Sequence, residues 1–160
     1  MSDQTDDSTD DADAMAEFTI RREFDVPVAD VWRAWTNEDE LAHWLGPYGV
    51  VRATVQFDVR VGGRYSYTMT NAETGEEYPT GGEFIEVMPM ERLAFSWGDP
   101  GAPVAGMPVV VLTFVDLGDQ TELVFHLNGY GGHPGDGFVY DGWDEALNNF
   151  GKHLAGESLT

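Results

Sequence analysis

The sequence contains no cysteine, and no stretch of it approaches the ~18 consecutive apolar residues of a membrane-spanning helix. The absence of cysteine excludes disulfides, thiolate catalysis, zinc ribbons and iron–sulfur centres. The N-terminus is acidic and lacks the basic and apolar regions of a signal peptide. We therefore expect a cytoplasmic protein with no membrane partner.

Basic residues are also scarce: 8 lysines and arginines stand against 29 acidic residues, which gives a net charge of −21. This field repels phosphates, so nucleic acid and anionic membranes are excluded as main partners. Solubility needs a net charge of only about 2 to 8. Strong self-repulsion becomes tolerable where molar salt shortens the Debye length to about 3 Å. We therefore hypothesise a protein from a salt-accumulating halophile.

Part of this charge lies in a segment that cannot fold. Residues 1–16 contain six aspartates and no basic residue, and they are predicted to form a disordered acidic tail. The remainder, with 42% hydrophobic residues in the whole chain, is typical of one globular domain. We place this domain at 17–156 and a short C-terminal tail at 157–160.

The first part of the domain is predicted to contain one strand followed by two short helices. Apolar residues alternate with polar ones over 18–24, which is typical of a half-buried strand. Pro27 is suited to the first position of a short helix, and 28–35 carries one apolar stripe. Asn37 followed by Glu40 predicts a capping box at the start of a second short helix.

Strands dominate the middle of the chain. Further strands are predicted at 51–59, 64–70, 81–87, 93–97, 109–115 and 121–127. Gly62-Gly63 predicts a bulge or tight bend, and a long amphipathic helix ends at Gly156 after starting at Asp141 or near Asp136. We expect an α+β fold in which a curved antiparallel sheet of six to seven strands wraps around a long C-terminal helix, with two short helices after the first strand.

Seven motifs, in this order and spacing, resemble the START-like helix-grip superfamily, also called SRPBCC. They are R-x-F-x-x-P at Arg22 to Pro27, VWRAWT (31–36), LAHWLGP (41–47), FDVRVGGRYSYTM (57–69), GGEFIEVMPMERLAFSW (81–97), TELVFHLNGYG (121–131) and DGWDEALNNFGKHL (141–154). The branch they are most similar to is named after the C-terminal domain of the activator of the ninety-kilodalton heat-shock-protein ATPase. The resemblance covers residues 17–155.

The resemblance implies a cavity between the sheet and the last helix that holds apolar or amphipathic small molecules. We therefore expect a binding protein for a lipid-like or aromatic metabolite, and we expect binding rather than catalysis. The alternatives are a polyketide-cyclase-like or hydrolase-like enzyme using the same cavity, and a chaperone-ATPase activator. We expect a monomer or a weak homodimer; the dimer is suggested by Val109, Val111 and Val115 on the presumed outer face of the sheet.

The aromatic residues independently favour a pocket, because alternation directs many of them to one concave face. The residues expected to line it are Arg22, Trp35, Tyr65, Tyr67, Met69, Phe84, Phe95, Trp97, Phe114, Phe125, Trp143, Leu147 and Phe150. Arg22 either anchors a ligand carboxylate, pairs with Glu86, or extends to solvent. Arg64 is expected to be structural.

The polar residues carry no recognisable catalytic or metal-binding motif. The four histidines lack the spacing of a metal site, and His126 is expected to face outward. No serine lies in a G-x-S-x-G motif, and the loop at 129–137 lacks the lysine of a phosphate-binding loop. We therefore predict no catalytic residue, no metal and no cofactor, and we leave His133 as a remote candidate for a general base.

Overall fold

The computed structural model describes residues 16–45, 50–101, 103, 106–136 and 139–156. The predicted acidic tail, except for Ala16, and the predicted C-terminal tail at 157–160 lie outside the described residues.

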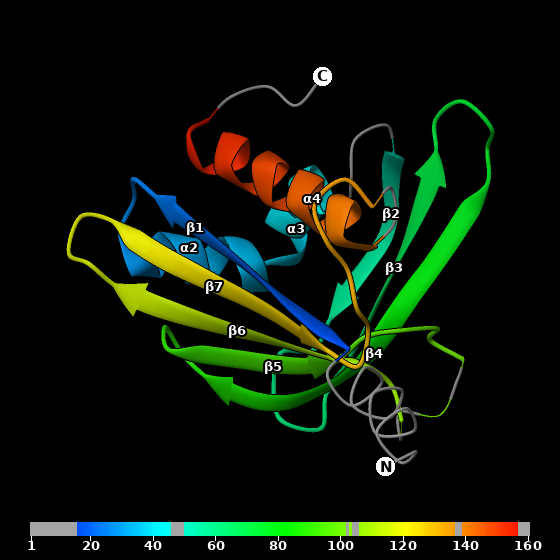
Figure 1. Cartoon of the computed structure of the whole chain (residues 1–160), viewed down its shortest axis with the longest axis horizontal. Helices are drawn as coiled ribbons and strands as arrows, with labels where there is room; N and C mark the ends of the chain where they lie inside the picture. Colours follow the sequence, from blue (N-terminus) through cyan, green and yellow to red (C-terminus); the bar gives the residue numbers. More distant parts are fainter. Residues whose placement is uncertain (1–15, 46–49, 102, 104–105, 137–138, 157–160) are drawn as a thin grey trace, which may run out of the picture.

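Within the described residues, seven antiparallel strands form one curved sheet (Figure 1). They are β1 (Glu17–Phe24), β2 (Val50–Phe57), β3 (Arg64–Asn71), β4 (Glu77–Met88), β5 (Arg92–Ser96), β6 (Val109–Asp116) and β7 (Thr121–Asn128). Their order is β1-β7-β6-β5-β4-β3-β2, so β2 to β7 form a meander and β1 joins it beside β7. The predicted α+β class and curved antiparallel sheet are confirmed.

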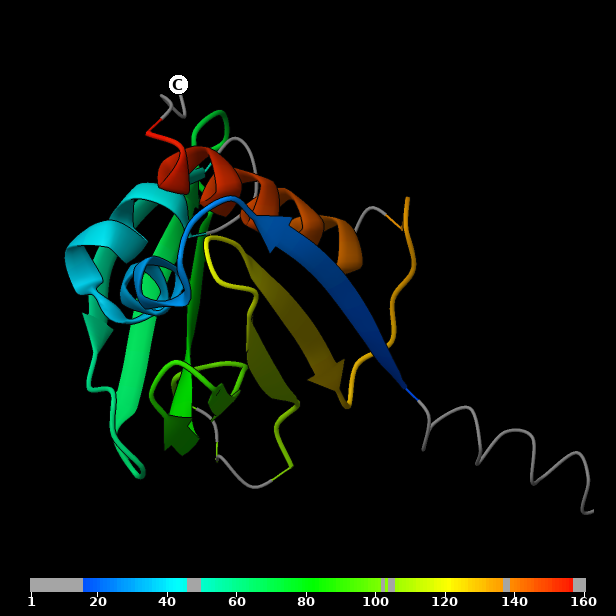
Figure 2. The same ribbon diagram turned by 90° about the vertical axis from the view of Figure 1, so that its left-hand side faces the viewer.

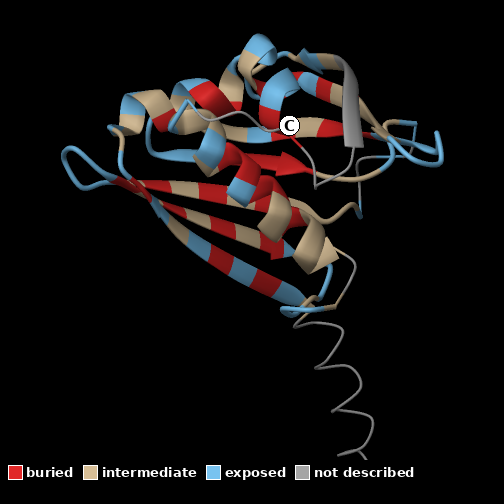
Figure 3. Cartoon of the chain, turned by 90° about the horizontal axis from the view of Figure 1, so that it is seen from above, coloured by how far each residue is buried: buried red, intermediate tan, exposed pale blue. Residues whose placement is uncertain are grey.

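Strands β1, β6 and β7 bury alternate residues, and Figure 3 shows such alternation as bands of colour along the ribbons, whereas β5 buries four consecutive residues, Leu93 to Ser96. On β7, Leu123, Phe125 and Leu127 are buried. His126 lies between them on the opposite face, where its Nε2 is 2.8 Å from a carboxylate oxygen of Glu17 on β1. The predicted outward orientation of His126 is therefore confirmed, because successive residues of a pleated strand point to opposite faces.

Two places in the fold have no room for a side chain and therefore require glycine. In β4, a Cβ on Gly82 would lie 2.1 Å from the carbonyl oxygen of Ser96, so only glycine allows β5 to approach this closely. Gly62-Gly63 makes the predicted tight bend before β3: Gly62 has a φ of +83°, and a Cβ on Gly63 would lie 2.1 Å from the Asp58 carbonyl oxygen.

Two short helices, α2 (Val28–Thr36) and α3 (Glu38–Trp44), follow β1. Pro27 is the N-cap of α2 rather than its first helical residue, because its ψ of 157° is extended. Asn37 caps α3 as predicted, with its side chain accepting from the Glu40 N–H at 3.1 Å. The Glu40 carboxylate does not complete the predicted capping box. It binds Arg33 and a residue of the last helix instead.

The last helix, α4 (Val139–Leu154), starts earlier than an Asp141 cap allows. The Asp136 carboxylate accepts from the backbone N–H of Tyr140 at 3.4 Å and of Asp141 at 3.3 Å, so the start near Asp136 is correct. Gly156 follows the helix with a φ of +77°, as expected of a glycine stop.

The helix α4 crosses the concave side of the sheet, with α2 and α3 beside it (Figures 1 and 2). The core lies between these layers, where Trp143, Leu147 and Phe150 of α4 face buried residues of the strands. No helix in the described part of the chain is long and apolar enough to cross a membrane.

Candidate ligand site between the sheet and the last helix

The structure brings together almost all of the residues predicted to line a cavity. Ten of them are buried in one core cluster: Trp35, Tyr65, Tyr67, Phe84, Phe95, Phe114, Phe125, Trp143, Leu147 and Phe150. Met69 and Trp97 are partly buried and pack against that cluster. Sequence reasoning omitted Phe57 from this group, although it alternates inward on β2 and its ring centroid lies 5.1 Å from that of Tyr65.

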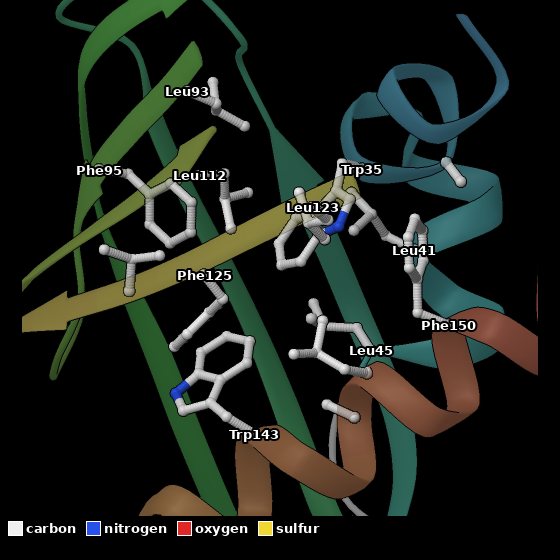
Figure 4. Close-up of a cluster of buried hydrophobic side chains, with 14 of the residues drawn as sticks. Trp35, Leu41, Leu45, Leu93, Phe95, Leu112, Leu123, Phe125, Trp143 and Phe150 are labelled. Atoms are coloured by element: carbon white, nitrogen blue, oxygen red, sulfur yellow. The ribbon is translucent and has the colours of Figure 1, made fainter. Parts of the chain in front are cut away.

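Trp143 is the centre of the aromatic contacts that join the helix to the sheet. Its ring centroid lies 4.6 Å from that of Phe125 on β7, and Figure 4 shows the two side chains facing each other. It also lies 5.8 Å from the centroid of Trp97, which follows β5, and 6.4 Å from that of Trp35 on α2. One side chain therefore links three parts of the fold.

Trp35, Trp97 and Trp143 share an unusual feature, and we refer to them as the indole cluster. Among the described residues, the buried Nε1 atoms of Trp35 and Trp143 have no hydrogen-bond partner, and that of Trp97 has none apart from its contact with the Tyr67 hydroxyl. In contrast, Nε1 of the buried Trp44 donates to the Ala34 carbonyl oxygen at 3.0 Å. A buried donor without a partner costs about 1–3 kcal/mol of stability, so the unpaired donors of Trp35 and Trp143 call for an explanation.

Two tyrosine hydroxyls lie on the same interior face. The Tyr65 hydroxyl donates to the Ser96 carbonyl oxygen at 2.6 Å, and burial raises its pKa well above the ordinary value. Burial also raises the pKa of Tyr67 to about 12, although side-chain hydrogen bonds with Trp97 and Thr80 lower it. Both hydroxyls are therefore protonated at neutral pH and do not act as bases.

Arg22 does not make the predicted pairing with Glu86. Its guanidinium binds the Asp144 carboxylate on α4, and its side chain is 30% exposed. Glu86 instead pairs with Arg92 on the neighbouring β5. Arg22 therefore fastens the first half of α4 to β1 and lies at the edge of the core. Arg64 pairs with Glu83 on β4 at 3.9 Å, which agrees with a structural role.

A second group of polar side chains lies where α2, α3 and α4 meet. Glu40 binds Arg33 Nε at 2.6 Å and His153 Nε2 at 2.8 Å, and Arg33 also binds Asp30 at 2.6 Å. Burial by itself raises the pKa of Glu40, but the hydrogen bonds from His153 and Arg33 outweigh it, and the pKa is lowered.

These residues line a small surface pocket of about 150 Å³, together with Val26 and Leu154. The ring of His43 stacks on that of His153 with centroids 5.9 Å apart. No group of three or more metal-ligating side chains occurs in the part of the chain that the structure describes. His133 is exposed in the loop before α4, where its Nδ1 lies 3.2 Å from the Pro134 carbonyl oxygen.

Comparison with known proteins agrees with this architecture. Residues 25–155 match the family described as "Activator of Hsp90 ATPase homolog 1-like protein". No curated protein matches the chain.

Solved structures of similar proteins cover most of the chain. A protein from Chromobacterium violaceum has 26% sequence identity and a TM-score of 0.73, with 84% of this chain and 94% of that one covered. A protein of the same family from Silicibacter pomeroyi has 23% identity and a TM-score of 0.74, with coverage of 88% and 98%. CalU16 from Micromonospora echinospora has 25% identity and a TM-score of 0.59, with coverage of 87% and 76%.

Proposed function

The chain belongs to the Activator of Hsp90 ATPase homolog 1-like family, and on this premise we propose that it binds an apolar or aromatic small molecule between the sheet and α4. The observation that carries the proposal is the indole cluster: the layer beneath α4 is aromatic, yet the Nε1 donors of Trp35 and Trp143 have no partner. A core selected for stability alone tends to satisfy such groups, as Trp44 does here.

Entry of a ligand requires α4 to move away from the sheet, because the interior rings are in mutual contact. Polar contacts hold the helix near both of its ends: Asp144 binds Arg22 on β1, and His153 binds Glu40 on α3. Contacts of this kind, partly exposed to solvent, contribute only about 0.2–1 kcal/mol each. The cost of opening therefore lies mainly in exposing the buried Trp143, Leu147 and Phe150 of α4, a cost that a bound apolar molecule would offset by covering the same surface.

Binding can be tested without knowing the natural ligand. The full chain, purified in molar salt, is examined by native mass spectrometry for a co-purified compound and then titrated with N-phenyl-1-naphthylamine, a neutral apolar dye that fluoresces on leaving water. We expect saturable binding by the native chain and loss of binding in Trp143→Ala. Trp32→Ala serves as the matched control, because Trp32 contacts Phe114 rather than the indole cluster. The proposal fails if the native chain neither carries a compound nor binds the dye.

Catalysis in the same interior is the second candidate function, and Tyr67 is the side chain that we consider as a proton donor or base. Within the described residues, the buried polar side chains of the core are those of Thr80, Ser96, Thr121 and Asn149, besides the tyrosine and tryptophan groups. With its pKa raised to about 12, Tyr67 could donate a proton to a developing oxyanion but could not serve as a base at neutral pH. This arrangement favours binding over acid–base catalysis.

We also propose that the acidic surface adapts the protein to high salt. Each arginine whose side chain is described pairs with a carboxylate, as Arg21 does with Glu122 and Arg60 with Asp58. Because 29 acidic residues face only 8 basic ones, most carboxylates have no such partner to offset their repulsion. Dissolved salt screens the repulsion among these carboxylates, which the few basic residues cannot neutralise.

A further inference from the structure

Three polar side chains form a hydrogen-bonded row on the outer face of the sheet, where β1 lies beside β7 (Figure 1). The Oγ1 atom of Thr19 is 2.8 Å from Nδ1 of His126, and Nε2 of the same ring is 2.8 Å from a carboxylate oxygen of Glu17. We refer to Thr19, His126 and Glu17 as the outer triad. These residues alternate with the buried residues of β1 and β7, so they lie on the other side of the sheet from the interior site proposed above.

The strand pairing explains why the hydroxyl and the imidazole are in contact. Thr19 and His126 are directly opposite each other in the register of β1 and β7. The N–H of Gly129 donates to the Ala16 carbonyl oxygen at 2.8 Å, and hydrogen-bonded pairs alternate with non-hydrogen-bonded ones from there. Thr19 and His126 are therefore a non-hydrogen-bonded pair, the type in which opposite side chains lie closest.

The hydrogen bonds also determine which atom of the ring carries a proton. A carboxylate only accepts, so Nε2 of His126 carries the hydrogen that Glu17 receives. In the neutral ring Nδ1 then has a lone pair, and the Thr19 hydroxyl donates to it. A hydroxyl, a base that can take its proton and a third group that orients the base make up the arrangement of nucleophilic catalysis.

The surroundings of the outer triad limit the substrates that it could use. Thr19 is exposed, so a substrate reaches the hydroxyl directly from solvent. Val111 of β6 lies opposite His126 in the register and is only partly buried, which provides an apolar neighbour for an aromatic ring. The net charge of −21 repels anionic acyl donors. An open face excludes little water, so the substrate must also have a good leaving group.

We propose that the outer triad hydrolyses neutral aryl esters of short-chain carboxylic acids, with Thr19 as the nucleophile and His126 as the general base. The Thr19 oxygen attacks the ester carbonyl carbon while its proton passes to Nδ1 of His126. The tetrahedral intermediate expels the phenol, which takes that proton, and the acyl group remains on Thr19. Water then attacks the acyl carbon, His126 transfers a proton from this water to the Thr19 oxygen, and the carboxylic acid leaves.

Two further groups support the attack. The Glu17 carboxylate acts as a positioning residue, because it holds the ring in the required tautomer and stabilises the imidazolium that forms. The backbone N–H of Thr19 points away from β7, since the pair is not hydrogen-bonded, and β1 is an outermost strand of the sheet that the structure describes. This N–H can therefore donate to the oxyanion of the tetrahedral intermediate.

Hydrolysis of p-nitrophenyl acetate by the full chain in molar potassium chloride tests the proposal. The release of p-nitrophenolate gives kcat and KM. We expect His126→Gln and Thr19→Val each to lower kcat/KM by about 100-fold, the lower end of what acid–base catalysis contributes. Thr19→Ser keeps a hydroxyl and should retain activity, and Glu17→Gln should lower kcat with KM unchanged. Thr113→Val, on the outer face of β6, is the matched control and should leave the rate unchanged.

Mass spectrometry of the acid-quenched reaction locates the acetyl group, which we expect as an ester on Thr19. A native rate no higher than that of Thr19→Val would overturn the proposal. A rate lost in His126→Gln but kept in Thr19→Val would also overturn it, because the imidazole would then attack the ester unaided. Acetylation confined to amines such as that of Lys152 would do the same. If His126→Gln fails to fold, the comparison of Thr19→Val with Thr19→Ser at an exposed position still decides.

Discussion

His153 in the last turn of α4 lies with its Nε2 2.8 Å from Oε1 of Glu40 in α3, although 113 residues separate them in the sequence. Glu40 simultaneously accepts from Arg33 on α2, so a single carboxylate ties together three helices. This contact holds the C-terminal end of α4, and the Arg22–Asp144 pair holds its first half against β1.

The Glu40 contacts predict a specific response to acid. Because the pKa of Glu40 is lowered in the folded protein, the stability that it contributes is present above its ordinary pKa of 4.5 and is lost as the pH falls through the lowered value. Glu40→Gln should cost about 1 kcal/mol at pH 6 and flatten the decline in unfolding free energy below pH ~4.5. Urea unfolding across pH, with Asp39→Asn on the same helix as control, measures this. An equal acid response in both variants would refute the assignment.

The Arg22–Asp144 pair predicts a salt-dependent coupling between β1 and α4. A double-mutant cycle with Arg22→Ala and Asp144→Ala should give a coupling energy of about 0.5–1 kcal/mol in dilute buffer and less in molar salt, because both side chains are partly exposed. Arg60→Ala with Asp58→Ala provides the control, since that pair is more exposed and should couple weakly. Coupling that persists unchanged in molar salt would contradict a screened surface contact.

Trp143 predicts a large effect on stability as well as on binding. The residue is 6% exposed and contacts rings from three elements, so Trp143→Ala should cost about 3–5 kcal/mol in chemical denaturation. Trp32→Ala, at a partly buried position, should cost less. If Trp143→Ala kept its stability but lost dye binding, Trp143 would be a wall of the site rather than part of the core.

Two glycines make a matched pair for testing the geometry of the sheet and of α4. Gly82→Ala should destabilise the protein by about 1–3 kcal/mol or prevent folding, because the new Cβ would lie 2.1 Å from the Ser96 carbonyl oxygen. Gly142→Ala in α4 should stabilise it by about 0.5–1 kcal/mol, because apart from the neighbouring residues and the backbone of its own helix no atom lies within 4 Å of its Cβ position. Thermal unfolding of both variants checks this, and a tolerated Gly82→Ala would show that β4 and β5 can separate.

The charge balance predicts that salt stabilises the fold. Screening weakens the repulsion among the excess carboxylates more than it weakens the few arginine pairs, so the melting temperature should rise steadily from dilute buffer to molar potassium chloride. The rise should be smaller when several exposed acidic residues are replaced by neutral amides. A melting temperature that is highest in dilute buffer would remove the support for a high-salt adaptation.

Local rules of the sequence were sufficient for most of the fold. Alternation along 121–127 predicted which side of β7 faces the core, because a pleated strand leaves no other choice. Asn37 predicted a helix start, since its side chain reaches a backbone N–H only three residues away. Where two local signals competed, at Asp136 and Asp141, the sequence left the start of α4 open, and only the backbone contacts of Asp136 decided it.

Partners distant in the chain were beyond that reasoning. The alternation of inward and outward residues placed Arg22 on the inner side of β1 and suggested Glu86 as its partner. Alternation could not show that the first half of α4 lies close enough to β1 for Asp144 to bind Arg22 instead. The same holds for Glu40 and His153, and for the indole cluster, whose members are spread from 35 to 143.

The sequence by itself determined the absence of thiol chemistry, the acidity, the strand faces and the aromatic character of the interior, because composition and short-range periodicity are properties of the chain alone. The tertiary structure decided which of those aromatics meet and which donors are satisfied. Trp44 finds the Ala34 carbonyl within its own helical hairpin, whereas Trp143 faces the rings of the sheet and finds no acceptor. Hydrogen bonding depends on distance and direction in space, and these arise only when the helix closes over the sheet.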